Sequence, residues 1–172
     1  MHRLVGIAAS CLACLFFAAA VYAWAPARKA GLWEMTTNMT WQQSPFPGGT
    51  PPPAAAAAFG GGPRTTQVCL TQAMIDKYGA PVPQGRGDCQ VSNVKLSDHG
   101  MTADMVCTGR MGGNATVESS WTDDEHATGK VHFTGTLQAG PSPKPIEWTI
   151  NSTSVYKGAD CGNVKPIEPS SK

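Results

Sequence analysis

Charged side chains are scarce in this chain, and neither sign prevails. Only 15% of the 172 residues are charged, against about a quarter in an average soluble domain. This scarcity argues against a disordered polyelectrolyte and against a solvated helical bundle. The 13 basic residues stand against 12 acidic ones, a formal net charge of +1, so no basic surplus exists to neutralise a phosphate backbone. We therefore expect no nucleic-acid partner.

The sequence also lacks the motifs of common catalytic and metal sites. Beyond the N-terminal region its histidines are His99, His126 and His132, and none belongs to a nucleophile elbow or a metalloprotease helix. The acidic run 123–125 lacks the spacing and the terminal glutamate of an EF-hand, and no Cys-x-x-Cys pair suggests zinc. We expect surface histidines, no catalytic residue, no enzyme and no cofactor.

The first 23 residues contain the longest uncharged apolar run. Arg3 precedes residues 4–23, which end in the small residue Ala23, and this order is typical of a secretory signal peptide cleaved before Trp24. A retained membrane anchor is the alternative, since about 20 apolar residues can cross a bilayer. Cleavage predicts a periplasmic or secreted single domain over 24–172, with no stable membrane span. Loss of Arg3 leaves 12 basic residues against 12 acidic ones.

Two segments contain little that could join a hydrophobic core. Residues 44–64 are rich in proline, alanine and glycine, with Phe46 and Phe59 as their large apolar side chains. Such a composition predicts a flexible loop, and leaves open whether it is a lid, a docking arm or filler. The tail 163–172 is expected to be loose as well.

The rest of the chain alternates between apolar or small and polar side chains with a period of two. The alternation is clearest in residues 33–41, 115–121, 131–137 and 146–151, and turn-forming residues separate the runs. Consecutive antiparallel hairpins with one face in water follow from this pattern. We predict an all-β fold in which a single antiparallel meander sheet curls into a barrel or half-barrel, a sandwich being the other way to bury the apolar face.

One short helix interrupts the strands. Thr71 is a plausible N-cap, and Met74, Ile75 and Tyr78 share one helical face. Gly79 can adopt the left-handed conformation that ends a helix. We expect this helix to close one end of the sheet.

An even number of cysteines follows the predicted signal peptide: Cys69, Cys89, Cys107 and Cys161. In an exported chain this indicates two disulfides, with three connectivities to choose from. If residues 97–100 form a hairpin loop and one bulge precedes it, Cys89 lies opposite Cys107. The remaining pair is then Cys69 with Cys161.

Five short motifs together resemble a known family. They are Gly31-Leu32-Trp33-Glu34, Val68-Cys69-Leu70-Thr71, Gly87-Asp88-Cys89, Val106-Cys107 and Asp160-Cys161. In this order and spacing they look like the small exported proteobacterial proteins grouped as domain of unknown function 3617. The resemblance covers most of the mature chain and implies an exported, disulfide-bearing, β-rich protein. It implies no activity and no catalytic residue.

The apolar stripes suggest a binding function. A curled sheet could leave a cavity for a lipid or another small hydrophobic ligand. The candidate ligand-lining residues are Trp33, Met35, Met39, Trp41, Trp121, Phe133 and Trp148. Any pocket is expected along the first strand near one end of the sheet, where the 44–64 loop could cover it. Alternatively these side chains simply fill the core.

Two other functions stay open at this point. The protein could be a structural or interaction protein of the cell envelope that uses a strand edge or the 44–64 loop. It could also bind Cu(I), because the pairs Met35 with Met39 and Met101 with Met105 supply thioethers. Methionine is more often a core filler, which makes copper the lesser alternative.

Overall fold

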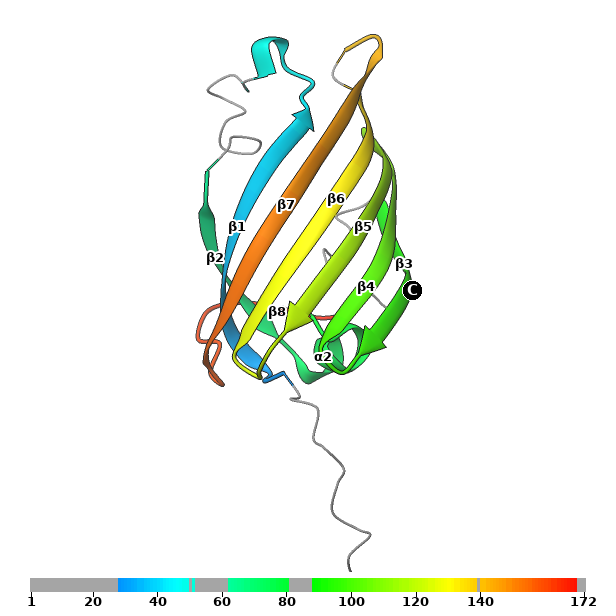
Figure 1. The fold of residues 1–172 in the computed structure, drawn as a ribbon. Helices are drawn as coiled ribbons and strands as arrows, with labels where there is room; N and C mark the ends of the chain where they lie inside the picture. Colours follow the sequence, from blue (N-terminus) through cyan, green and yellow to red (C-terminus); the bar gives the residue numbers. More distant parts are fainter. Residues whose placement is uncertain (1–27, 50, 52–61, 81–87, 139, 170–172) are drawn as a thin grey trace, which may run out of the picture.

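The computed structural model describes most of the chain downstream of the predicted signal peptide. It covers residues 28–49, 51, 62–80, 88–138 and 140–169. The predicted signal peptide lies outside these residues, as does most of the predicted 44–64 loop. The chain forms one curled sheet with a short helix at one end (Figure 1).

Eight strands and two short helical segments account for the regular structure. In chain order they are β1 (Gly31–Gln43), the 3-10 turn η1 (Pro47–Gly49), β2 (Arg64–Leu70), α2 (Gln72–Tyr78), β3 (Cys89–Ser97), β4 (Gly100–Thr108), β5 (Met111–Trp121), β6 (His126–Gln138), β7 (Pro143–Gly158) and β8 (Pro166–Ile167). Neither helical segment of this described part has the length and apolarity needed to cross a bilayer.

The strands lie side by side in the order β3-β4-β5-β6-β7-β1-β2-β8. From β3 to β7 the chain runs as an antiparallel meander, and β1 pairs antiparallel with the edge of β7 that faces away from β6. The two-residue strand β8 pairs with β2 in parallel. In β4 buried and exposed residues alternate along the strand, as a period of two requires when one face is covered. The predicted all-β fold with a barrel-like curl is confirmed.

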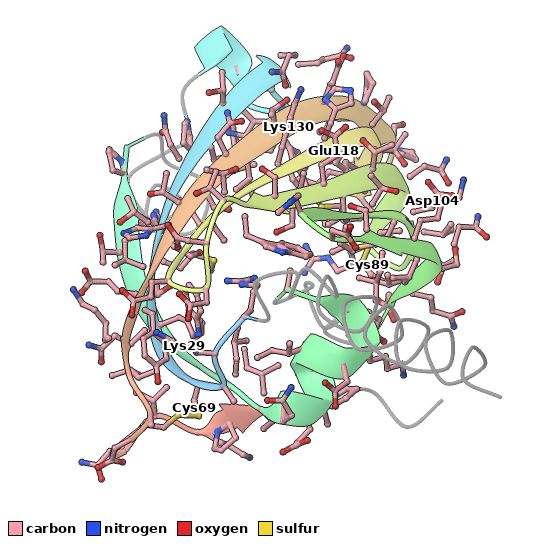
Figure 2. All side chains as sticks on the ribbon, turned by 60° about the horizontal axis from the view of Figure 1, so that its bottom comes forward. Lys29, Cys69, Cys89, Asp104, Glu118 and Lys130 are labelled. Atoms are coloured by element: carbon pink, nitrogen blue, oxygen red, sulfur yellow. A yellow bond between two sulfur atoms is a disulfide. The ribbon has the colours of Figure 1, made fainter. Side chains whose placement is uncertain are left out.

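The helix α2 lies between the two edges of the sheet at one end (Figure 2). Its N-cap Thr71 accepts a hydrogen bond from the Met74 backbone N–H at 3.2 Å, and Gly79 at its C-terminus has φ 65°. Met74 and Tyr78 pack into the main core. These caps and this buried face are the ones that the sequence predicts.

Thr71 also joins the helix to the last strand, because its hydroxyl donates to the Ile167 carbonyl at 3.2 Å. We expect Thr71→Ala to lower the free energy of unfolding by about 1 to 2 kcal/mol, since an N-cap is lost together with this second hydrogen bond. Urea denaturation measures the change. Thr71→Ser keeps the hydroxyl and is the control; a loss as large in the serine variant would contradict the capping role.

Both predicted disulfides are present. Cys89 pairs with Cys107 across β3 and β4, and Cys69 with Cys161, bonds that span 18 and 92 residues of sequence. The bulge occurs between Ser92 and Lys95. Two disulfides indicate an oxidising compartment outside the cytoplasm.

The expected loose tail contains ordered structure. Within residues 163–169, β8 pairs with the end of β2, and Ile167 packs against the core. The Cys69–Cys161 bond holds the chain beside β2 just before this segment. Composition alone did not indicate this pairing, because two residues are too few to produce a periodic pattern.

Candidate functional site

A row of mostly small side chains crosses the inner face of the sheet. Strand register places Met101, Ser119, Gly129, Ser152 and Thr37 opposite one another on β4, β5, β6, β7 and β1. Because interior side chains must fill the space inside a small curled sheet, three residues as small as serine and glycine leave room there. Position 129 itself has no room for a side chain beside Ser152, because an added Cβ would stand only 2.7 Å from the Ser152 hydroxyl oxygen.

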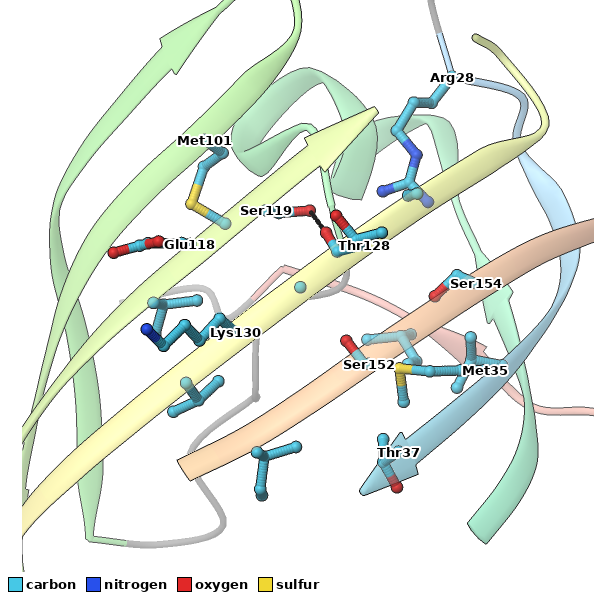
Figure 3. A pocket seen from close by; sticks show the side chains of 17 residues that line it. Arg28, Met35, Thr37, Met101, Glu118, Ser119, Thr128, Lys130, Ser152 and Ser154 are labelled. Atoms are coloured by element: carbon cyan, nitrogen blue, oxygen red, sulfur yellow. Dashed lines mark hydrogen bonds between the residues drawn. The ribbon is translucent and has the colours of Figure 1, made fainter. Parts of the chain in front are cut away.

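This row lines a cavity of about 420 Å³ inside the curled sheet (Figure 3). Inward residues of the two adjoining rows also line it, among them Met35, Ala127, Val117, Val131 and Ile150. Val68 and Ile167, from β2 and β8, line it too. The volume is within the range of about 300 to 1,000 Å³ that small-molecule sites occupy.

Large aromatic side chains fill the inside of the sheet on either side of the cavity. Toward the end of β6, Phe133 is fully buried and stacks on Trp148, with ring centroids 5.1 Å apart. Gly113 lies against this ring, because a Cβ there would approach Phe133 to 2.8 Å. Toward α2, Trp33 and Trp121 are buried. The cavity therefore lies between two packed layers.

At the α2 end, the cavity is bordered by a buried arginine. Arg28 is 4% exposed, and its guanidinium carbon lies 4.3 Å from the ring centroid of Trp33 and 5.8 Å from that of Trp121. Its Nη1 donates to the Gly79 carbonyl at 3.1 Å. Burial lowers the pKa of Arg28 to about 10, because the charged form loses hydration. The side chain is thus still cationic at neutral pH.

The adjacent cation is placed quite differently. Lys29 is partly exposed and forms ion pairs with Glu125 at 2.6 Å and Asp124 at 3.0 Å, and its hydrogen bonds to Glu125 and Asp124 raise the pKa of Lys29. In the same turn, backbone N–H groups and His126 lower the pKa of Asp123. The acidic run 123–125 is therefore a hairpin turn that binds a lysine of this chain.

The other predicted site residues are dispersed. Of the seven candidate ligand-lining residues, Met35 lines the cavity; Trp33, Trp121, Phe133 and Trp148 are buried in the layers beside it. Met39 and Trp41 pack at the edge of the core, Trp41 edge-on to Phe46 at 6.2 Å. The cavity lies closer to the middle of β1 than the sequence suggests.

The methionines and histidines do not gather at one place. Met101 and Met105 are buried core residues. The ring of His132 contacts Thr149 and Glu147 on the outer face, and that of His126 contacts Asp123. Across the described ranges, no three histidine, cysteine or acidic residues are grouped closely enough to hold a metal ion.

Sequence reasoning missed Arg28 and the row of small residues. The row had a visible signal, because Ser119, Gly129 and Ser152 are small residues at inward positions of three strands, but their alignment depends on register. Arg28 gave no signal, because it precedes the first strand and belongs to no periodic run.

A scan against protein-family models matches residues 28–161 to a protein of unknown function, DUF3617. The chain belongs to the DUF3617 family. Searches of curated proteins and of solved structures found no match. The family match begins at Arg28 and ends at Cys161, so it includes both disulfides and all the lining residues of the cavity described above except Ile167.

Proposed function

We propose that this DUF3617 protein binds a small hydrophobic ligand inside its curled sheet, without catalysis, in the periplasm or as a secreted protein. The cavity carries this proposal. A sheet that needed only to be stable would be expected to fill its interior, because packing voids cost stability. Here the space coincides with a row of small residues and is flanked by aromatic layers.

The chemistry of the lining supports binding. Its inward side chains are mostly apolar, with a few hydroxyls from Ser119, Ser152, Ser154 and Thr37, the composition expected of a site for a small apolar molecule. The exposed residues Glu118, Thr128 and Lys130 also line it (Figure 3). The described residues that line it include no histidine and no cysteine. Export is supported by the two disulfides and by the signal-like N-terminus.

Filling the cavity tests the proposal. Ser152→Leu places a larger side chain at the centre of the small-residue row, so we expect the affinity for the neutral fluorescent probe N-phenylnaphthylamine to fall about tenfold or more. Fluorescence titration of the delipidated, disulfide-bonded protein measures the affinity, and thermal melting shows whether the fold is kept.

The matched control is Thr153→Leu. Thr153 follows Ser152 on β7 but is exposed on the outer face of the sheet, so the same leucine there should leave probe binding unchanged. No saturable binding by the wild-type protein would refute the proposed function. Equal losses in the two variants would show that the probe binds elsewhere.

A further inference from the structure

The guanidinium of Arg28 has donors without acceptors. Its Nε and Nη2 are buried and have no hydrogen-bond partner among the residues that the structure describes, and no carboxylate of those residues forms an ion pair with it. The nearby acidic residues Asp124 and Glu125 are bound to Lys29 instead. Buried donors on a charged group are costly when they stay unpaired, so this arrangement needs an explanation.

The two unpaired nitrogens have a specific geometry. Nε and Nη2 lie on one edge of the planar guanidinium, where their N–H bonds run nearly parallel and match the two oxygens of a carboxylate. The third nitrogen, Nη1, is held by Gly79, and the rings of Trp33 and Trp121 lie nearby. These contacts orient the edge of the guanidinium that carries Nε and Nη2, here called the fork, before any ligand binds.

Arg28 borders the apolar cavity. Arg28 is one of its lining residues, and its guanidinium points into the space shared with Ser154 and Met35 (Figure 3). From Trp33, which contacts Arg28, to Thr37 in the small-residue row, β1 extends about 13 Å at 3.3 Å per residue. The site therefore combines the cation Arg28 with a lining that is mostly apolar from Met35 to Ile150, to which the exposed Glu118 and Lys130 also belong.

We propose that Arg28 binds the carboxylate of a single-chain fatty-acid-like ligand whose hydrocarbon tail occupies the cavity. The inference rests on the proposed function and names its ligand class. A single chain suits a cavity of about 420 Å³, which is near the lower end for small-molecule sites. A carboxylate completes the hydrogen bonds of Nε and Nη2 and neutralises the buried charge, whereas a neutral head group does not.

The experiment compares decanoate with decanol, which share a chain length and differ in charge. Calorimetric titration of the delipidated, disulfide-bonded protein at neutral pH is expected to show decanoate binding about ten- to a hundredfold more tightly, the usual effect of hydrogen bonds to a charged group. In Arg28→Met, decanoate should bind no more tightly than decanol. The affinity for decanol should change little.

Two further variants separate recognition from folding. Lys29→Met removes the adjacent cation, which is partly exposed and outside the cavity, and should leave the preference for decanoate intact. Arg28→Lys keeps a positive charge but not the fork, and should reduce the preference severalfold. If Arg28→Met fails to melt cooperatively, Arg28→Lys replaces it as the variant that tests the role of Arg28.

The outcomes distinguish the two proposals. Binding of decanol with no preference for decanoate would overturn the role of Arg28 and leave the binding function standing. Failure of both ligands to bind would overturn both. A preference that survives in Arg28→Met would place the carboxylate elsewhere. Decyl phosphate is the third ligand. If it binds more tightly than decanoate, the proposal that the ligand carries a carboxylate is overturned, and a phosphate ester takes its place.

Discussion

Removing the Cys69–Cys161 bond by a double alanine substitution is expected to lower the free energy of unfolding by about 4 to 5 kcal/mol. The bond closes a loop of 92 residues, and the chain-entropy model assigns this much to a loop of that length. The bond also fixes the residues that lead into β8 against β2, so its loss should free this edge of the sheet. Equilibrium denaturation in urea measures the change.

The second disulfide is the internal comparison. Cys89–Cys107 closes only 18 residues, for which the same model gives about 3 kcal/mol, and its two strands remain joined by a hairpin ladder. The double alanine variant at these positions should therefore remain the more stable of the two. The reverse order would show that loop length does not control the effect.

Replacing Phe133 with alanine is expected to cost about 3 to 5 kcal/mol, as for other large side chains removed from a packed core. Phe133 is fully buried, stacks on Trp148, and lies against Gly113 of the neighbouring strand. The backbone on both sides is held in a continuous ladder, so the strands cannot readily close the space. Urea or thermal denaturation gives the magnitude.

Val106→Ala is the matched control for this substitution. Val106 lies on the outer face of β4 and is 43% exposed, so its truncation should change stability by no more than about 0.5 kcal/mol. A similarly small effect of Phe133→Ala would mean that the aromatic layer is not packed. In that case the boundary of the cavity would have to be drawn again.

Much of this fold follows from local chemistry. Alternation in residues 115–121 and 131–137 defines strands, Thr71 and Gly79 define the helix ends, and the 97–100 turn sets the register that brings Cys89 to Cys107. Each of these features depends on neighbours in sequence or on one hairpin. Such features can be predicted because few alternatives satisfy the same hydrogen bonds and the same buried face.

The cavity depends on long-range geometry instead. Ser119, Gly129 and Ser152 become neighbours only through the register of two hairpins, and Thr37 joins them because β1 pairs with β7 on one side while it pairs with β2 on the other. Arg28 is buried because α2 and the sheet enclose it from segments about 50 to 90 residues away. No local pattern encodes that environment.

The open sheet has two free margins, and both are poor templates for another strand. At one margin β3 is kinked by its bulge, where Asn93 has φ 51°, and Lys95 adds a charge. At the other margin β8 has only two residues, which pair with the end of β2, and β2 itself is a short strand of seven residues. Bulges, charges and short edge strands are the means by which sheet proteins prevent unwanted strand addition. A half-barrel built in this way can stay open for a ligand without inviting aggregation between copies.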